Sequence, residues 1–148
     1  MGLIHHIYVS SARVPADAAM LDDILSVSVR NNEAAGITGM LLYAGGTFMQ
    51  VLEGEEQAVS ATHERIKRDS RHMGIIVLEH APIESRSFVR WSMGYRGLSA
   101  AEGATAPAFA PFFSSGFDAA TIGAHPGVGL AMLRHFAVDQ RELRSQSA

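Results

Sequence analysis

The stretch SVRNNEAAGITGMLLYAGGTFMQVLEG, residues 28–54, holds the pattern that decides the fold. Its first part completes a helix, because apolar residues spaced three and four apart begin after Asp17 and stop at Gly36. Two segments rich in β-forming residues follow, Ile37–Tyr43 and Thr47–Glu53. The Gly-Gly pair between them supplies the positive φ angles that a tight turn needs. This stretch therefore predicts a helix that leads into a β-hairpin.

The same signals continue on both sides of the hairpin. Leu3–Ser10 is a short apolar run typical of a buried strand, and Gly74–Leu78 and Phe88–Tyr95 predict two more strands. Glu55–Asp69 predicts a second helix, since it opens with acidic residues and carries basic residues near its end. The resulting order is β-α-β-β-α-β-β. We expect an α+β fold of the ferredoxin-like type, a mixed sheet with two helices on one face.

The composition changes after Leu98. Residues 99–126 are rich in Ala, Gly, Ser and Pro and almost free of charge, yet they include four phenylalanines. These are Phe109, Phe112, Phe113 and Phe117. A flexible linker would not carry so many aromatic rings, so short helices or turns should lay them on the sheet, and a helix over Val128–Leu143 should follow. We expect a domain of residues 1–98 and a C-terminal helical extension of residues 99–148, which packs on the sheet, forms an oligomer interface, or does both.

Composition also narrows the function classes. The 148 residues are 47% hydrophobic and 18% charged, which suits one compact domain. The net charge of −3 leaves no basic surplus for nucleic-acid binding, and no apolar run is long enough to span a membrane. The sequence has no cysteine, and its seven histidines show no spacing typical of metal ligands. We expect a cytoplasmic protein that holds no metal and binds neither nucleic acid nor a membrane.

Two polar side chains stand out in segments that are otherwise apolar. Gln50 lies in the middle of TFMQVLEG, where strand alternation places it on the face of Phe48 and Leu52. A buried amide without partners costs about 1–3 kcal/mol, and Tyr8 in the first strand has the same need for a partner. Because glutamine offers either an acceptor oxygen or a donor nitrogen, an amide beside a phenol can form a hydrogen-bonded pair with two states. Taken alone, each of the two residues is also explained as an ordinary buried side chain whose hydrogen bonds are satisfied.

Other notable positions have ordinary explanations when they are taken singly. Asn31 and Asn32 fit the C-cap of the first helix. The basic residues around Arg71 fit a solvated patch that complements the dipole of the second helix. Trp91 and Met93 share a face of the fifth predicted strand, which is typical of core packing.

Together and in order, these residues resemble the BLUF domains, a family of flavin-based blue-light sensors. The resemblance covers residues 3–97. Its motifs are IYVS with Tyr8, SVRNNEAAGITGMLLYAGGTFMQVLEG with Asn31, Asn32 and Gln50, IKRDSRH ending in Arg71 and His72, and FVRWSMGY with Trp91 and Met93.

The resemblance implies a flavin, FAD with FMN as the alternative, held between the two helices with its edge toward the sheet. Ile24 and Ile66 would flank its faces. The cofactor-binding residues implied in this way are Ile24, Ser28, Asn31, Asn32, Gln50, Arg65, Ile66, Asp69, Arg71 and His72. An apolar slot with a few convergent polar groups is also what a planar cofactor needs.

The resemblance further implies a mechanism and an output. Light drives an electron and then a proton from Tyr8 to the flavin, after which Gln50 rotates or tautomerises. Trp91 and Met93 would relay this change from the fifth strand to the C-terminal segment and on to a separate partner protein. We therefore expect a short, homo-oligomeric photoreceptor that is not itself an enzyme.

Two other classes stay open from the residues alone. One is a small ferredoxin-like enzyme, such as an acylphosphatase-like hydrolase that uses Arg71 and Asn32 on an anion. The other is a plain oligomerising module in which Tyr8 and Gln50 are satisfied core groups. Both predict a colourless protein, so a visible spectrum separates them from the light sensor.

Overall fold

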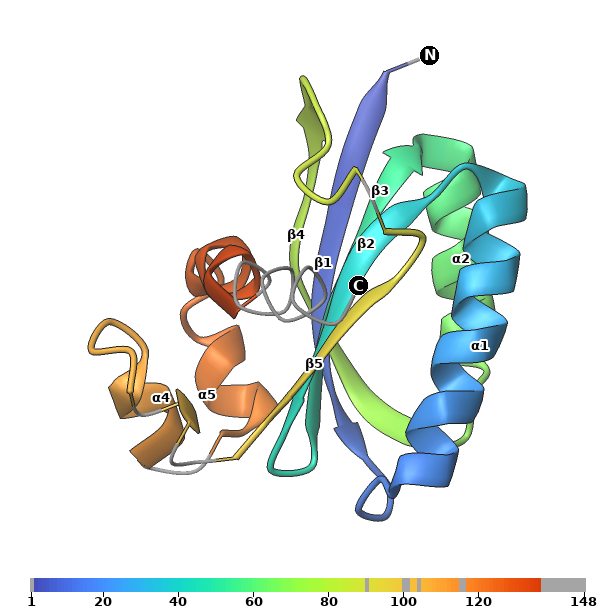
Figure 1. The fold of residues 1–148 in the computed structure, drawn as a ribbon. Coiled ribbons are helices and arrows are strands. Elements are labelled where there is room, and N and C mark those ends of the chain that lie inside the picture. Colours follow the sequence, from blue (N-terminus) through green and yellow to red (C-terminus); the bar gives the residue numbers. More distant parts are fainter. Residues whose placement is uncertain (1, 90, 100–101, 104, 115–116, 137–148) are drawn as a thin grey trace, which may run out of the picture.

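A five-stranded mixed sheet forms the centre of the protein, in a computed structural model that describes residues 2–89, 91–99, 102–103, 105–114 and 117–136 (Figure 1). The strands are β1 (Leu3–Ala12), β2 (Thr38–Ala44), β3 (Thr47–Glu55), β4 (His72–Ile83) and β5 (Gly94–Leu98). The helices are α1 (Ala18–Ala35), α2 (Glu56–Lys67), α4 (Ala110–Ser114) and α5 (Ala119–Gly123), and residues 128–136 are also helical. The strand order is β4-β1-β3-β2-β5, and only the β2–β5 pair is parallel. The predicted α+β, ferredoxin-like fold is confirmed.

The first helix and the hairpin follow the local signals of the sequence. The side chain of Asp17 caps α1, because its Oδ1 accepts a hydrogen bond from the backbone N–H of Met20 at 2.8 Å. Gly36 ends the helix in the left-handed conformation, with φ at 70°. In the turn between β2 and β3, Gly45 and Gly46 have φ angles of 54° and 82°, which residues with a Cβ rarely adopt. Local chemistry therefore places the hairpin directly after α1.

Strand β4 is longer than the sequence pattern predicts. The expected strand covered Gly74–Leu78 and was closed by Pro82, whereas the observed strand runs through Pro82 to Ile83. β4 lies at the edge of the sheet and pairs only with β1. An edge strand tolerates proline because part of its backbone faces no neighbouring strand, so the missing N–H breaks no ladder there.

The fifth strand begins later than predicted. It covers only Gly94–Leu98, and the preceding β4–β5 segment (residues 84–89 and 91–93) contains no strand. The backbone N–H groups of Ser87 and Phe88 donate to the buried carboxylate of Glu53 at 2.6 and 3.0 Å. A side chain thus takes the place of a neighbouring strand as the partner of these groups.

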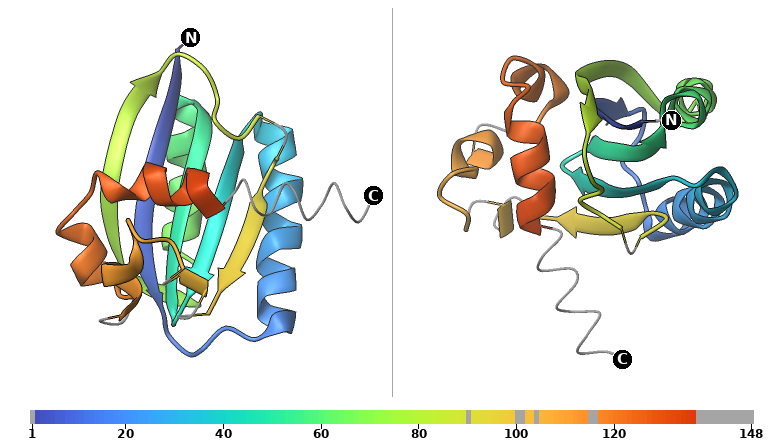
Figure 2. Two further views of the ribbon diagram at one scale, coloured as in Figure 1. Left: turned by 60° about the vertical axis from the view of Figure 1, so that its left-hand side comes forward. Right: turned by 90° about the horizontal axis from the view of Figure 1, so that it is seen from above.

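The sheet is covered on both faces (Figure 2). Helices α1 and α2 lie on one face, and α4, α5 and residues 128–136 lie on the other. The buried side chains under α1 and α2 are Ile4, Ile37, Leu41, Phe48, Leu52, Val59 and Met93. The core on the other face includes Ile7, Val9, Met40, Leu42, Met49, Val51, Trp91, Phe109, Phe113, Phe117, Ile122, Met132, Leu133 and Phe136. The described residues therefore form two separate hydrophobic cores, one on each side of the sheet.

Trp91 and Met93 belong to different cores, so two predictions about them were wrong. They do not lie on β5, and they do not share a face of the sheet. The alternation rule applies only to extended strands, whereas the chain at these positions is irregular. Trp91 stacks on Phe88 and lies in the core that also holds the aromatic rings of the C-terminal segment, whereas Met93 lies in the core on the side of α1 and α2.

The C-terminal part crosses the sheet at close range. A Cβ atom on Gly129 would lie 2.9 Å from the Cδ1 atom of Leu78 and 3.2 Å from the Cγ2 atom of Ile7, so glycine permits this approach. Of the helix predicted over Val128–Leu143, residues 128–136 are helical and the remainder lies outside the described residues.

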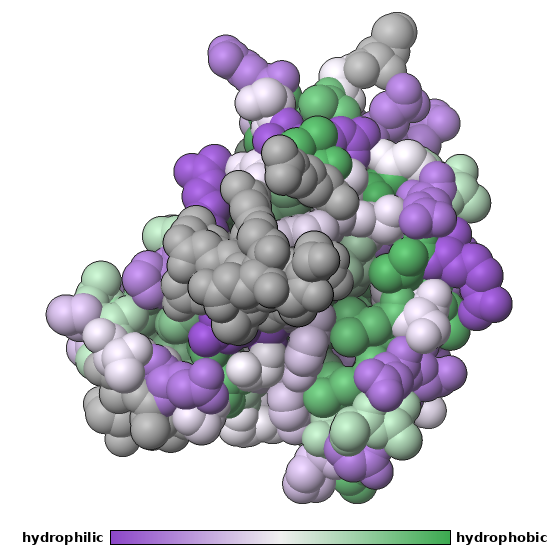
Figure 3. All heavy atoms as spheres, viewed as in Figure 1, coloured by the Kyte–Doolittle hydropathy of each residue, from purple (hydrophilic) through white to green (hydrophobic). Residues whose placement is uncertain are grey.

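The hydrophobicity of the surface also differs from one region of the fold to another. On the face drawn in Figure 3, hydrophobic side chains gather between β5 and α1, whereas the outer edge of α1 is hydrophilic. Within the described part of the chain, no helix has the length and apolar character needed to cross a membrane.

Candidate functional site

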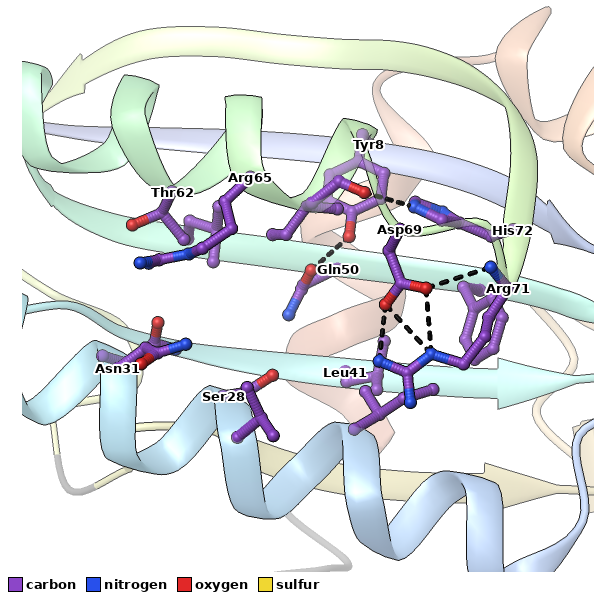
Figure 4. Close-up of a pocket in the computed structure, with 16 residues that line it drawn as sticks. Tyr8, Ser28, Asn31, Leu41, Gln50, Thr62, Arg65, Asp69, Arg71 and His72 are labelled. Atoms are coloured by element: carbon purple, nitrogen blue, oxygen red, sulfur yellow. Dashed lines mark hydrogen bonds and ion pairs between the residues drawn. The ribbon is translucent and has the colours of Figure 1, made fainter.

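A cavity lies between α1, α2 and the sheet (Figure 4). Together with the open space at its mouth, it encloses about 760 Å³. The lining residues are Tyr8, Ile24, Val27, Ser28, Asn31, Asn32, Leu41, Phe48, Gln50, Leu52, Thr62, Arg65, Ile66, Asp69, Arg71 and His72. The structure brings together around one space Tyr8 and all the residues that the sequence analysis assigned to a cofactor. It does not bring Trp91 or Met93 to the cavity wall.

Several lining residues were missing from the sequence-based set: Val27, Leu41, Phe48, Leu52 and Thr62. Strand alternation already placed Phe48 and Leu52 on the face of Gln50. Leu41 needed the register of the hairpin, in which it pairs with Gln50. Thr62 lies one helical turn before Ile66, a spacing that could have identified it.

Tyr8 and Gln50 form the floor of the cavity. They lie opposite each other on the antiparallel strands β1 and β3, so their side chains emerge on the same face. The Tyr8 hydroxyl donates a hydrogen bond to the Gln50 Oε1 atom, and both side chains are at least 96% buried. Burial, reinforced by the negative charge of Asp69, raises the pKa of Tyr8. The phenol therefore keeps its proton at neutral pH and acts as a hydrogen-bond donor.

The other end of the Gln50 amide faces a weak partner. Its Nε2 atom donates to the Sδ atom of Met93 at 3.3 Å. A thioether sulfur accepts hydrogen bonds less well than oxygen does. Gln50 is thus held firmly at its oxygen and loosely at its nitrogen, an arrangement that a competing acceptor could reverse.

Asn32 connects α1 to the β4–β5 segment. It lies inside α1 and not at its cap, because Gly36 ends the helix, so the capping explanation for the two asparagines was wrong. The Asn32 side chain is buried, and its Nδ2 atom donates to the backbone oxygen of Ser92 at 2.7 Å. Ser92 immediately precedes Met93. The cavity wall and the partner of Gln50 are therefore held by one short piece of chain.

Charged side chains cross one end of the cavity. Arg71 donates to both carboxylate oxygens of Asp69 at 2.6–3.0 Å and to the Oδ2 atom of Asp23 on α1 at 2.8 Å. The hydrogen bonds from Arg71 lower the pKa of Asp69. A guanidinium that already contacts two carboxylates is poorly available to a substrate anion, which argues against the hydrolase alternative.

His72 and Arg65 complete the polar lining. The Nε2 atom of His72 lies 2.7 Å from the backbone oxygen of Ile66, and its Nδ1 atom lies 2.8 Å from the Ser10 hydroxyl. Both ring nitrogens therefore have partners, which fixes the ring. Arg65 comes from α2 at the end of the cavity where Asn31 rises from α1, away from Arg71 (Figure 4).

The cavity has the chemistry that a flat heteroaromatic ring requires. Ile24 from α1 and Ile66 from α2 supply apolar walls, while the carboxamides of Asn31, Asn32 and Gln50 can pair with the carbonyl and N–H groups of an imide edge. The guanidinium of Arg65, which also lines the cavity, is suited to carbonyl or phosphate oxygens. The residues present fit a flavin.

Comparisons with known proteins agree with this chemistry. The family model for BLUF, "Sensors of blue-light using FAD", matches residues 3–94. Among curated proteins, the photoactivated adenylate cyclase subunit beta of Euglena longa is 34% identical over 87 residues, which are 58% of this chain and 10% of that protein. The corresponding subunit alpha of Euglena gracilis is 37% identical over 86 residues, or 58% of this chain and 8% of that protein. The chain thus spans about a tenth of the length of these relatives.

Solved structures cover more of the chain. The dark-state structure of BlrB, a BLUF protein, has a TM-score of 0.66 and 31% identity, and the match covers 84% of this chain and 97% of that one. A structure of Klebsiella pneumoniae BlrP1 with FMN and cyclic diGMP has a TM-score of 0.60 and 31% identity, over 67% of this chain and 26% of that one. The likeness to BlrB extends past the end of the family match, into the C-terminal part.

Proposed function

The chain belongs to the BLUF family of blue-light sensors that use FAD, and we propose that Tyr8 and Gln50 are the residues that convert light absorption into a change of hydrogen bonding. One observation carries this proposal. A buried phenol donates to a buried amide at the floor of the cavity, while the far end of the amide has only a thioether as its partner. Such a pair has a second arrangement of similar energy within reach.

The binding assignment follows from the positions of the side chains. Ile24 and Ile66 would lie against the two faces of the ring, and Asn31 and Asn32 would pair with its polar edge. The remaining proposed contacts are Ser28, Gln50, Arg65, Asp69, Arg71 and His72, all of which line the same cavity.

The chemistry divides between the cofactor and the chain. A bound flavin would supply the absorption of blue light and an acceptor for one electron and one proton, and in this proposal Tyr8 gives up both. While the Tyr8 hydroxyl lacks its proton, it ceases to be a donor to Gln50 and becomes an acceptor. Gln50 can then rotate or tautomerise, and the return of both the electron and the proton to Tyr8 leaves the new pairing in place.

The new pairing would be read by Met93. Rotation of the amide turns its oxygen away from Tyr8 and withdraws the Nε2 donor from the sulfur of Met93. Because the segment that holds Met93 also holds Ser92 against Asn32 and Trp91 in the opposite core, the change can cross the sheet. We propose that Trp91, Met93 and β5 relay the signal in this way.

We assign residues 1–98 to the sensor and residues 99–148 to an extension on its output side. Support comes from Trp91, which packs in the same core as Phe109, Phe113 and Phe117. In addition, Arg134 donates to the Ser87 hydroxyl at 2.8 Å and so joins the C-terminal helix to the β4–β5 segment. The proposed receptor is a cytoplasmic homo-oligomer that catalyses no reaction of its own and acts on a separate protein.

FAD is the proposed cofactor, with FMN as the alternative. The family description names FAD, whereas one similar structure contains FMN. Mass spectrometry of the flavin released from the purified protein decides between the two.

Illumination of the purified protein tests the proposed function. We expect a yellow protein whose flavin absorption shifts modestly to the red under blue light and returns in the dark. Tyr8→Phe should keep the flavin and lose the reversible shift, because it removes the donor without emptying the cavity. Tyr43→Phe is the matched control, since Tyr43 lies on β2 and packs against the lining residue Phe48 without lining the cavity itself. A colourless protein, or an unchanged shift in Tyr8→Phe, would overturn the proposal.

A further inference from the structure

Three histidines gather behind Tyr8, outside the cavity lining. They are His6 on β1, His63 on α2 and His80 on β4. The ring centroids of His6 and His63 lie 4.2 Å apart, and those of His6 and His80 lie 5.1 Å apart. His63 also meets the Tyr8 ring edge-on, at 5.4 Å between centroids and 63° between planes. The proposed function gives no role to these residues.

The outer member of the group is open to solvent. His80 is 39% exposed, and its Nε2 atom lies 3.6 Å from a carboxylate oxygen of Glu56. Its Nδ1 atom lies 2.9 Å from the Nδ1 atom of His6, so one of the two rings donates and the other accepts. An added proton on His80 would make both of its nitrogens donors, one toward Glu56 and one toward His6. His80 thus connects the solvent and Glu56 to the buried ring of His6.

The inner members resist a charge of their own. Among the described residues, the Nε2 atom of His6 and the Nδ1 atom of His63 are buried without a hydrogen-bond partner. Burial, together with the neighbouring rings of His63 and His80, lowers the pKa of His6 to about 4. Burial and the charge of Lys67 lower that of His63. Burial therefore disfavours a positive charge on either of the two inner rings.

Other ionisable groups around the three histidines come from β1, from α2, from the turn after α2 and from β4. They are Tyr8 from β1, Glu56, Glu64 and Lys67 from α2, Asp69 from the turn after α2, and His72 from β4. The rings are not arranged as a metal site, since no group of three possible metal ligands occurs among the described residues.

We propose that His63, backed by His6 and His80, is a positioning residue for Tyr8, and that protonation of this histidine group weakens Tyr8 as an electron donor. This inference rests on the proposed function. The ring centroid of His6 lies 5.1 Å from that of His80 and 6.2 Å from that of Tyr8. A positive charge on this group opposes the removal of an electron from the Tyr8 ring, because its field is only partly screened over such separations. The photoconversion of the receptor would therefore respond to pH as well as to light.

A pH series on the flavin-loaded protein tests this inference. We expect the rate of photoconversion at fixed light intensity to fall about fivefold between about pH 7.5 and about pH 5.5, the effect of a screened charge near the donor. His80→Gln keeps a polar side chain at an exposed position and should reduce this change to less than about twofold. His63→Phe keeps an aromatic ring against Tyr8 and leaves the exposed His80 in place, so it should keep the pH dependence. His125→Gln is the matched control, because His125 is exposed in the C-terminal part, and it should keep the wild-type profile.

An independent readout comes from NMR titration of the imidazole signals. If the rings are linked as described, His80→Gln alters the titration of His6 and His63, whereas His125→Gln leaves it unchanged. Equal pH profiles in the wild-type protein and in His80→Gln would overturn the inference even when photoconversion is normal at neutral pH. Loss of the light-induced shift at every pH in the wild-type protein would instead contradict the proposed function.

Discussion

The two faces of the central sheet differ in how their interiors are held. On the face away from the cavity, Ile122, Met132 and Leu133 are fully buried among other apolar side chains. On the cavity face, Tyr8 and Gln50 are buried through hydrogen bonds, one of which ends at a sulfur atom. A close-packed apolar core has one good arrangement, whereas a small set of exchangeable hydrogen bonds has two. Under the proposed function, stability and switching therefore lie on opposite sides of the same strands.

Strand β3 belongs to both faces at once. Gln50 points to the cavity, while its neighbours Met49 and Val51 are in the opposite core. This strand is paired on both sides, so it cannot move freely. The β4–β5 segment is held instead by side chains such as Glu53 and Asn32. A change at Gln50 is more easily passed to that segment than along β3.

Gln50→Leu should have the largest effect on the difference between the two faces of the sheet. Leucine keeps the volume of the side chain but removes both hydrogen bonds, so the cavity face loses its second arrangement. We expect flavin to remain bound and the reversible spectral shift to be lost, with an unfolding free energy lower by about 1–3 kcal/mol because the Tyr8 hydroxyl loses its partner. Visible spectra before and after illumination, with urea unfolding, measure both effects.

Gln57→Leu is the control for that substitution, because Gln57 is exposed on α2. It should leave both the shift and the stability close to wild type. A persistent light-induced shift in Gln50→Leu would show that switching does not depend on the amide.

Ile122→Ala tests the opposite face. The side chain of Ile122 is fully buried in the core beyond the sheet, so its truncation leaves a cavity that should cost about 2–5 kcal/mol of unfolding free energy. The flavin spectrum in the dark should not change. Thermal and urea unfolding measure the loss. A spectral change as large as that of a cavity-face variant would mean that the two faces are not separate.

The sequence predicts one face far better than the other. Around Gln50, the helix, the turn and the strand alternation are all local signals, and the four motifs of the BLUF resemblance add the cavity residues. Leu41 was missed because its place depends on the pairing of β2 with β3. The contact between Tyr8 and Gln50 likewise depends on the antiparallel pairing of two strands far apart in the chain.

The region around Trp91 shows where sequence reasoning fails. FVRWSMGY has the composition of a strand, so alternation predicted one face for Trp91 and Met93. In the structure, the carboxylate of Glu53 binds backbone N–H groups that a strand would have paired with its neighbour. A buried carboxylate more than 30 residues away in sequence thus overrides local preference. The histidine group behind Tyr8 was missed for the same reason, since three separate elements contribute to it.

Glu53→Gln should have an intermediate effect. An amide can accept at its oxygen but places its NH₂ group near backbone donors, so the β4–β5 segment loses part of its anchor. We expect the unfolding free energy to fall by about 2 kcal/mol and the light-induced shift to become smaller because Met93 is held less firmly. Glu84→Gln, at an exposed position of the same segment, should change neither. An unchanged stability in Glu53→Gln would mean that the segment is fixed by its apolar contacts alone.

Asp69→Asn should have the smallest effect, because the ion pair with Arg71 lies at the partly exposed end of the cavity. Hydrogen bonds from Arg71 lower the pKa of Asp69 in the folded protein, so its stabilisation is complete above the pKa of the unfolded chain and is lost as the pH falls through the folded value. At neutral pH we expect Asp69→Asn to lower the unfolding free energy by less than about 1 kcal/mol.

The difference in unfolding free energy between the wild-type protein and Asp69→Asn should shrink as the pH is lowered below the ordinary range of an aspartate pKa. The wild-type carboxyl then becomes neutral as well. Urea unfolding at neutral and acidic pH measures it, with Asp22→Asn on the exposed side of α1 as the control. A loss that stays constant with pH would assign the role of Asp69 to its shape and not to its charge. The polar groups of the cavity face would then stabilise the fold by packing, as the opposite face does, and the contrast between the two faces would be confined to Tyr8 and Gln50.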